Sequence, residues 1–390
     1  MRRKLSLLLV VVMMLTVFVA CNQNNKPAEE TVEETPVETA EETTEPAAEP
    51  AEEEVEEEYV PSVETVKPEN VEVGPIAKIG LGNISSTNSS KDVGDNAALA
   101  QADVTIAAVA FDAEGKIVEA KIDVAQTKVN FAEDNKNADI PEGAEYKTKL
   151  ELGPEYGMLK ASPIGKEYDE QMYAFLEYII GMTAEEVVNI PTRVKDDHHQ
   201  NVPDVADILT STTMDIGSYV QVVKEAWDNA VDADGATKLG LGVKTGAKGT
   251  EAADDKPARI QIDTYMNALG LDDEDKVVAN IIDVVQAKID VDAEGKIVER
   301  IADVKSKKEL KEEYGMTKAS EIGKEWFEQM MVWEEFTIGK TNEEIQGIPV
   351  KVRDENHQHV PDLPELATSV TITVEGYQEV MNKAFENANK

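Results

Sequence analysis

The chain has 390 residues, with 38 basic and 78 acidic side chains, so its formal net charge at pH 7 is −40. Such a charge repels nucleic acid and anionic membrane surfaces, so we expect no nucleic-acid partner and membrane contact only through an anchor. The one cysteine, Cys21, excludes an intramolecular disulfide, a thiol redox pair and a cysteine-rich metal or iron–sulfur site. Any redox chemistry must therefore come from a bound cofactor.

The N-terminus has the pattern of a targeting segment. Basic residues at positions 2–4 precede an apolar run at 5–20, and a run of about 16 residues suits a signal peptide better than a membrane span. We predict a signal peptide at 1–20. The sequence Phe18-Val19-Ala20-Cys21 resembles a bacterial lipobox, which implies that Cys21 is lipidated and anchors the mature chain to the outer surface of the cell membrane.

Residues 21–73 form an acidic segment of Glu, Thr, Pro, Ala and Val, with no aromatic residue before Tyr59. A segment of this composition cannot bury enough apolar surface to offset its conformational entropy, so we predict a disordered tether. Fifty flexible residues span roughly 40 Å, and charge repulsion extends them further. The tether can therefore hold a folded domain away from its lipid anchor.

The remainder of the chain contains two copies of one sequence pattern. The segment at 156–167 recurs at 314–325, an offset of 158 that holds to the C-terminus. Upstream, 78–82 matches 238–242 with an offset of 160, and 112–116 matches 292–296 with an offset of 180. We predict two tandem domains, 74–232 and 236–390, with length differences in the loops between these matches.

Each copy mixes the periodicities of strands and helices. Residues 104–111 and 117–124 are predicted strands around a turn at 112–116. Ser162, followed by Pro163, predicts the start of a helix that ends near Ile180, before Gly181. The predicted fold class is α+β, with an antiparallel sheet and helices packed on it.

Short and terminal helices follow in both copies. Thr183 with Glu186, and Thr341 with Glu344, have the spacing of capping boxes. Each copy closes with a helix that carries an apolar stripe. The stripes are Tyr219, Val223, Trp227 and Ala230 in the first copy, and Tyr377, Met381, Phe385 and Ala388 in the second.

A hydroxyl-rich stretch precedes each terminal helix. Residues 207–213 read Asp-Ile-Leu-Thr-Ser-Thr-Thr, and residues 365–371 read Glu-Leu-Ala-Thr-Ser-Val-Thr. On composition alone these stretches could be β-strands, because Thr and Val favour strands. Their repetition in register, directly before a helix, makes them candidate functional sites instead.

The order of an acidic residue, two spacers, Thr, two small residues and Thr resembles the flavinylation motif Asp-x-x-Ser/Thr-Gly-Ala-Thr of the FMN-binding domain family. That family includes a flavinylated component of the sodium-translocating NADH:quinone reductase and its counterpart in the Rnf complex, in which a flavin transferase attaches FMN through its phosphate to the final Thr. The resemblance implies two tandem FMN-binding domains with covalent FMN on Thr213 and Thr371. The further cofactor-binding residues that it implies are Asp207, Thr210 and Ser211 in the first copy, and Glu365, Thr368 and Ser369 in the second.

The match to this motif has three departures. Its Gly is Ser211 or Ser369, its Ala is Thr212 or Val370, and its Asp is Glu365 in the second copy. Thr212 therefore places a second hydroxyl beside the predicted acceptor. Aromatic and sulfur-containing side chains upstream are candidates for lining the flavin ring or for core packing. They are Tyr156 and Met158, with Tyr314 and Met316 as their equivalents.

Other cofactor motifs fit less well. Gly80-Leu81-Gly82 lacks the third glycine and the following helix of a dinucleotide fingerprint, and a calcium loop starting at Asp290 would need Glu where Ile301 stands. All four histidines lie in two equivalent loops, and His199 and His357 are the equivalent pair. One histidine and one or two carboxylates per copy are too few for zinc, so we expect no metal and place both histidines in a polar loop beside the cofactor.

A lipobox, an acidic tether and two such domains together resemble the lipoproteins of flavin-based extracellular electron transfer in Gram-positive bacteria. The resemblance implies a non-catalytic electron carrier that takes electrons from a membrane quinone-linked donor and passes them to ferric iron or soluble flavin. One alternative is a solute-binding lipoprotein that delivers a small ligand to a transporter. Another is a cell-wall spacer or adhesin without a cofactor.

Overall fold

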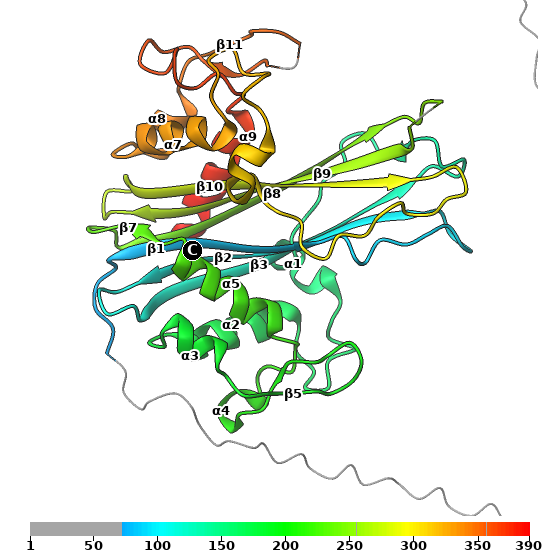
Figure 1. The fold of residues 1–390 in the computed structure, drawn as a ribbon. Helices are drawn as coiled ribbons and strands as arrows, with labels where there is room; N and C mark the ends of the chain where they lie inside the picture. The colour runs from blue at the N-terminus through cyan, green and yellow to red at the C-terminus, as the bar shows by residue number, and fades with distance from the viewer. Residues whose placement is uncertain (1–71, 255, 356) are drawn as a thin grey trace, which may run out of the picture. The chain divides into compact units, whose positions relative to one another are not determined.

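The computed structural model describes residues 72–254, 256–355 and 357–390. The predicted signal peptide, Cys21 and all but the last two residues of the predicted tether lie outside these residues. In the described part, the chain forms antiparallel sheets with helices packed on them (Figure 1). The predicted α+β class is therefore confirmed. Each described helix is too short or too polar to cross a lipid bilayer.

The first repeat begins with a sheet of three long antiparallel strands. These are β1 (Lys78–Ser86), β2 (Leu99–Phe111) and β3 (Ile117–Phe131). The predicted turn at 112–116 joins β2 to β3, with Gly115 at a φ of 81° that glycine adopts without strain. Two short strands extend the sheet at its edges, β4 (Ala138–Asp139) and β7 (Val231–Asp232).

The second repeat has an equivalent sheet of β8 (Lys238–Thr250), β9 (Ala258–Leu271) and β10 (Val277–Val291). The turn between β9 and β10 is at 272–276, where Asp275 has a φ of 57°. This turn, and not the one at 292–296, is the structural equivalent of 112–116. The predicted offset of 180 is therefore wrong, because 292–296 follows the third strand of its sheet, whereas 112–116 precedes it.

The two sheets pack face to face across one hydrophobic core. Alternate side chains of each strand point into it, such as Ile106 and Ala108 of β2 and Ile260 and Ile262 of β9. The intervening side chains point outward into a second core on each side, as Val109 does in the first repeat. Because both faces of each sheet are covered, residues 106–111 of β2 are all apolar.

Helices cover the outer face of each sheet (Figure 1). In the first repeat they are α1 (Lys149–Leu152), η1 (Gly153–Tyr156), α2 (Tyr168–Ile179), α3 (Ala184–Val188), α4 (Ala206–Leu209) and α5 (Gly217–Asp228), with the two-residue strands β5 (Thr192–Arg193) and β6 (Val202–Pro203). In the second repeat they are α6 (Lys307–Leu310), η2 (Lys311–Tyr314), α7 (Trp326–Thr337), α8 (Asn342–Gln346) and α9 (Glu375–Ala388), with β11 (Val350–Lys351) and β12 (Val360–Pro361).

The paired glycines of β1 and β8 are explained by the terminal helices. A Cβ atom on Gly80 would overlap the carbonyl oxygen of Ala226 in α5, and one on Gly240 would overlap that of Ala384 in α9. Gly82 and Gly242 meet their helices in the same way. The Gly-Leu-Gly motif therefore allows close packing of a helix backbone on a strand, with the intervening leucine pointing into the core between the sheets.

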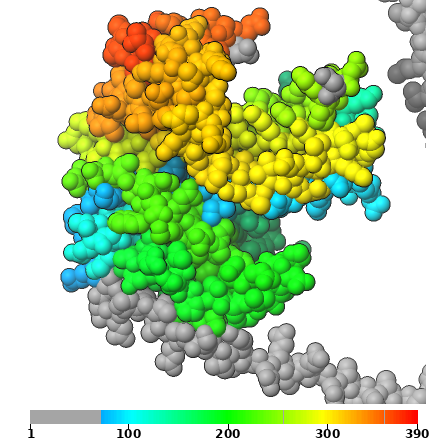
Figure 2. Space-filling model, in the orientation of Figure 1, coloured from blue at the N-terminus to red at the C-terminus, as the bar shows by residue number. Residues whose placement is uncertain are grey.

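Each repeat also covers an edge of the other repeat's sheet. After β10 the chain runs beside β1, where Val304 N–H donates to the Ser85 carbonyl at 2.9 Å and Thr87 N–H donates to the Ile301 carbonyl at 2.8 Å. In the other direction, Tyr146 forms a bridge with Thr245 of β8. The yellow residues after β10 lie against the first repeat in Figure 2. These crossings pair backbone groups that would otherwise be exposed at sheet edges.

The predicted helix boundaries are partly right. The helix expected from Ser162 begins at Tyr168, because Gly165 has a φ of 62° and Glu167 forms the N-terminal capping box with Glu170. Its end at Ile179, before Gly181, agrees with the prediction. The two predicted capping boxes, at Thr183–Glu186 and Thr341–Glu344, are confirmed. Helix α5 ends at Asp228, so Ala230 lies beyond it.

Candidate functional site

Thr213 lies in a turn between α4 and α5, on the outer side of the first sheet's helices. Residues 210–213 form no strand, so the β-strand alternative for this stretch is wrong. The Thr213 N–H donates a 2.9 Å hydrogen bond to Oε1 of Gln171 in α2, and its Oγ1 donates to the same oxygen at 3.3 Å. A single amide oxygen therefore holds both the backbone and the hydroxyl of Thr213.

The Gln171 amide is itself fixed in orientation. Its Nε2 donates to Ser162 Oγ at 3.0 Å and to the Lys166 carbonyl at 3.2 Å, and the side chain is almost fully buried. These two acceptors require the nitrogen to point toward the loop before α2, so the oxygen must point toward Thr213. Ser162, which does not start the helix, has this positioning role instead.

The second repeat has the same arrangement at residues offset by 158. Thr371 N–H donates to Gln329 Oε1 at 2.8 Å, and Thr371 Oγ1 donates to it at 3.3 Å. Gln329 Nε2 donates to Ser320 Oγ at 3.2 Å and to the Lys324 carbonyl at 3.3 Å. The two predicted acceptor threonines therefore share one hydrogen-bond pattern, although Glu365 and Val370 depart from the family motif.

The structure distinguishes Thr213 from the neighbouring hydroxyl of Thr212. Thr212 is fully buried, and its Oγ1 donates a 3.0 Å hydrogen bond to the Gln171 carbonyl. Its equivalent, Val370, is also fully buried. Thr213 is partly exposed and lines a cavity. Of these two hydroxyls, only that of Thr213 faces a space that a ligand can enter.

This cavity has a volume of about 320 Å³ and is formed by the helices and loops of the first repeat. Its lining consists of Lys149, Tyr156, Met158, Ala161, Ser162, Tyr168, Gln171, Lys195, His198, His199, Thr213, Met214, Asp215 and Tyr219. The volume lies in the range of small-molecule sites, and the lining combines three tyrosines and two methionines with eight polar or charged side chains. We refer to it as the threonine cavity.

A lysine lies over aromatic rings at the same position in both repeats. Lys149 Nζ is 4.8 Å from the Tyr156 ring centre and 5.1 Å from that of Tyr168. Lys307 Nζ is 5.0 Å from the ring centre of Tyr314 and 5.2 Å from that of Trp326. Burial lowers the pKa of Lys307 to about 8, although nearby Asp263 and Asp283 oppose this shift. Tyr156 and Tyr314 therefore hold cations as well as packing against the core.

The histidine loop forms one wall of the threonine cavity. His199 Nδ1 lies 2.7 Å from Oδ1 of Asp196, and the His198 N–H and the His199 ring lower the pKa of this aspartate. Asp215 follows the hydroxyl-rich stretch and connects it to the histidine loop. Its Oδ2 accepts hydrogen bonds from the N–H groups of Gln200 at 2.7 Å and Asn201 at 2.8 Å. The loop and Thr213 are therefore held in one structure.

The equivalent loop of the second repeat keeps the same ion pair and adds an arginine. His357 Nδ1 lies 2.7 Å from Asp354 Oδ1. Arg353, at the position of Lys195, donates through Nη1 to the Thr371 carbonyl at 3.0 Å. Arg353 thus contacts Thr371 and also pairs with Asp354 at 3.1 Å, whereas Lys195 lines the same cavity as Thr213. A positive side chain near the threonine suits a phosphate group.

The other residues of the predicted motif lie at the surface, outside the lining of the threonine cavity. Asp207 is exposed in the first turn of α4, Thr210 is exposed at its end, and Ser211 Oγ donates to the Ile208 carbonyl at 3.0 Å. Glu365 and Thr368 are likewise exposed, and Ser369 is partly exposed. Cys21 lies outside the described residues. The structure thus brings Thr213 and His199 together and separates Asp207 from them.

Several residues at the site were not identified from sequence. They are Gln171, Gln329, Lys149, Lys307, Lys195 and Asp215. The one signal that could have indicated Gln171 is its recurrence as Gln329 at the offset of 158. Within the described residues, no group of three or more His, Cys, Asp or Glu side chains is arranged to hold a metal ion.

The first site fits a flavin phosphate in its chemistry. Tyr156 and Met158 are the half-buried aromatic and thioether groups of its lining, whereas Tyr168 and Tyr219 are buried. Lys149 and Lys195 supply positive charge for a phosphate, and Thr213 supplies the hydroxyl. Comparisons of this chain with known proteins gave no matching family model, no matching curated protein and no matching solved structure.

Proposed function

We propose that this protein is a lipid-anchored electron carrier with one FMN attached covalently to Thr213 and one to Thr371. The observation that carries the proposal is the repeated hydrogen-bond pattern at these threonines, with Gln171 or Gln329 accepting from both the N–H and the hydroxyl. The pattern is kept in both repeats, although Thr371 is buried and Thr213 is only partly buried. A flavin transferase would form the phosphoester bond by transfer of FMN from a flavin dinucleotide. The threonine oxygen would become the bridging atom, the pyrophosphate bond of the donor would break, and a nucleoside monophosphate would leave.

In this proposal the flavin supplies the electron chemistry and the protein supplies binding and orientation. Gln171 orients the Thr213 hydroxyl so that its free lone pairs face the cavity. Lys149, held over two tyrosine rings, stabilises negative charge within the cavity, and Lys195 lies at its polar side. Covalent attachment prevents loss of the flavin by dilution outside the cell, because the tether keeps its local concentration high.

The partners follow from the predicted anchor. We propose that Cys21 carries the lipid on the outer surface of a Gram-positive cell membrane, that the electron donor is a membrane quinone-linked protein, and that the acceptors are ferric iron or soluble flavin. Such a carrier needs no catalytic residues of its own. Since the tether is strongly acidic, it would favour approach of a ferric or other cationic acceptor.

Intact mass spectrometry after coexpression with a flavin transferase tests this proposal. The unmodified sequence should carry two FMN groups, Thr213→Ala and Thr371→Ala should each carry one, and the double variant none. Thr212→Val is the matched control, because the second repeat has Val370 at that position, and it should keep both groups. Two adducts on the double variant would refute the assignment. A colourless, unmodified protein would instead favour the solute-binding alternative.

A further inference from the structure

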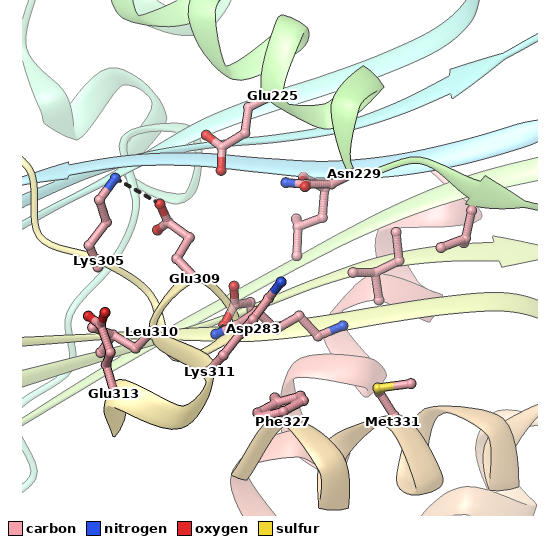
Figure 3. A pocket seen from close by; sticks show the side chains of 14 residues that line it. Glu225, Asn229, Asp283, Lys305, Glu309, Leu310, Lys311, Glu313, Phe327 and Met331 are labelled. Atoms are coloured by element: carbon pink, nitrogen blue, oxygen red, sulfur yellow. Dashed lines mark hydrogen bonds and ion pairs between the residues drawn. The ribbon is translucent and has the colours of Figure 1, made fainter. Parts of the chain in front are cut away.

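A second cavity, larger than the threonine cavity, lies where the two repeats meet (Figure 3). Its volume is about 640 Å³. In Figure 3 side chains from α5 of the first repeat face side chains from α6, η2 and α7 of the second across this space. We call it the inter-repeat cavity. None of the residues discussed above as flavin ligands lines it.

Part of the apolar lining of this cavity is exposed to solvent, unlike the side chains of a hydrophobic core. Phe327 and Met331 project from α7 beside Leu81 and Ile281 of the two sheets, and Met331 retains 59% of its accessible surface. In the first repeat the positions equivalent to Phe327 and Met331 are Asp169 and Tyr173. The phenyl ring of Phe327 is therefore specific to the second repeat, whereas the position of Met331 carries a large exposed side chain in both repeats.

The backbone of Lys311 is strained. Its φ is 47° and its ψ is −116°, a conformation that favours glycine, and the equivalent residue of the first repeat is Gly153, with a φ of 48°. A non-glycine residue in such a region costs about 1–3 kcal/mol and is typical of functional sites. The second repeat thus accepts strain at a position that adds a lysine to the cavity lining.

The other charged groups in the cavity already have partners. Lys305 pairs with Glu309 at 3.0 Å, and Lys308 pairs with Glu334 at 2.6 Å. Buried Asp283 accepts from Ser306 Oγ at 2.6 Å and from the Lys308 N–H at 3.0 Å. Among the described residues, no carboxylate lies within ion-pair distance of Lys311. Its ammonium group is therefore available to a ligand.

The remaining carboxylates oppose an anion only weakly. Burial, reinforced by Glu309 and Asp283, raises the pKa of Glu225 to about 7, so this side chain carries only part of a charge at neutral pH. Glu313 is exposed to solvent, where its charge is screened. The cavity lining thus combines the Lys311 ammonium group with the thioether of Met331 and the phenyl ring of Phe327, which are groups that suit an aromatic ligand.

We propose that the inter-repeat cavity binds a small aromatic molecule with an anionic group, its ring on Phe327 and Met331 and its anion at Lys311. The cavity lined by Lys244, Glu379 and Lys383 has a similar volume, about 600 Å³, but only Ala144 and Tyr146 of its lining are apolar or aromatic, whereas six of the fourteen residues that line the inter-repeat cavity are apolar. Size alone therefore does not distinguish the two cavities. The apolar lining and the strained lysine do.

Isothermal titration of the full chain with naphthalenesulfonate, and with uncharged naphthalenemethanol, tests this proposal. Saturable binding of both probes is expected, with the sulfonate tighter. Lys311→Gln should weaken the sulfonate about tenfold and leave the uncharged probe unchanged. Phe327→Ala should weaken both. Neither probe requires a flavin on Thr213 or Thr371, so the result is independent of flavin attachment.

Matched variants define the outcomes. Lys296→Gln removes an exposed lysine outside the cavity, and Tyr173→Ala removes the exposed ring at the position equivalent to Met331; both should bind as the unmodified chain does. Lys311→Gly also removes the ammonium group, but it relieves the backbone strain at this position. It should lose sulfonate affinity as Lys311→Gln does, and this loss could not be attributed to misfolding. No saturable binding, or binding that Lys311→Gln and Phe327→Ala leave unchanged, would overturn the proposal.

Discussion

Lys383 of the second repeat donates a 2.6 Å hydrogen bond to Glu151 of the first, whereas the two equivalent positions on the opposite side are both glutamates, Glu225 and Glu309. The repeats thus meet at two equivalent contacts, one with a pair of opposite charges and the other with two carboxyl groups. Lys383–Glu151 joins α9 to α1 by an ion pair. At the other contact, Glu225 of α5 faces the inter-repeat cavity beside carboxylates.

Replacement of Glu225 by Gln should therefore stabilise the protein in a pH-dependent way. The pKa of Glu225 is raised from 4.5 to about 7 by burial and neighbouring carboxylates, so the folded state binds more protons than the unfolded state between these pH values. Its contribution to stability consequently falls as pH rises through this window. We expect the unfolding free energy of Glu225→Gln to exceed that of the unmodified chain by about 1–2 kcal/mol at pH 8 and by less at pH 5. This value is reduced to allow for screening by solvent.

Urea unfolding at the two pH values measures this difference. The glutamine keeps an acceptor for the Asn83 N–H, which donates to Glu225 Oε2 at 3.1 Å, so the variant changes charge with little change in contacts. A gain in stability that is equal at both pH values would contradict the raised pKa.

Glu225→Lys should reproduce the ion pair of the other contact. The new lysine would face Glu309 as Lys383 faces Glu151, and we expect a gain in unfolding free energy at pH 8 that Glu309→Gln reduces. A double-mutant cycle of these two substitutions gives the coupling free energy directly. A coupling energy of zero would show that the two contacts differ in backbone geometry as well as in charge.

Gln171→Leu should lower flavin attachment at Thr213 severalfold and leave attachment at Thr371 unchanged. The substitution removes the acceptor of the Thr213 N–H and hydroxyl and leaves partly buried donors unpaired, at a cost of about 1 kcal/mol in stability. Peptide mass mapping reads both sites in one molecule, so the second repeat is an internal control.

Gln329→Leu should show the reverse pattern of attachment. Gln171→Glu keeps an acceptor for Thr213 but loses the amide donor to Ser162, and should recover part of the attachment. Equal loss at both threonines in either leucine variant would point to general unfolding instead of a local positioning role.

Gly82→Ala should destabilise the first repeat by about 3 kcal/mol, because its methyl group would overlap the Val222 carbonyl in α5 and force helix and strand apart. Gly246→Ala is the matched control. It also lies in a first strand, but its added methyl group would meet no atom within 4 Å. Chemical unfolding of both variants should separate them clearly. Similar stabilities would mean that α5 moves away from β1 at little cost.

Lys311→Gly should raise the unfolding free energy by about 1 kcal/mol, because relief of backbone strain exceeds the added entropy of glycine in the unfolded chain. Gly153→Ala, at the equivalent position of the first repeat, should lower it. Thermal unfolding of both variants checks the pair. A Lys311→Gly variant less stable than the unmodified chain would show that the lysine side chain has a structural contact of greater value than the strain.

Sequence periodicity predicted the parts of the fold that depend on local interactions. The capping boxes at Thr183 and Thr341 and the turn at 112–116 involve residues that are close in sequence, and all are present. The start of α2 was misplaced because Ser162 and Pro163 are also favourable in a turn. The backbone conformation of Gly165, which ends that turn, has no distinct sequence signal.

Long-range relationships were harder to predict. The packing of the two sheets on each other depends on which face of β2 meets β9. An apolar run such as that of β2 indicates that both faces are buried, but it does not indicate which element packs on each face. Gln171 was missed because a glutamine on an amphipathic helix is usually solvated. Its role depends on Thr213, 42 residues further along the chain.

The order of layers has a consequence for the proposed carrier. Thr213 is held by α2 outside one sheet and Thr371 by α7 outside the other, so two sheets separate them. With about 10 Å per layer, their separation is on the order of 30 Å. Since electron tunnelling falls exponentially with distance, two flavins so placed would be electrically insulated from each other. Each molecule would then act as two independent relays that exchange electrons with outside partners, and current would pass between molecules more readily than through one.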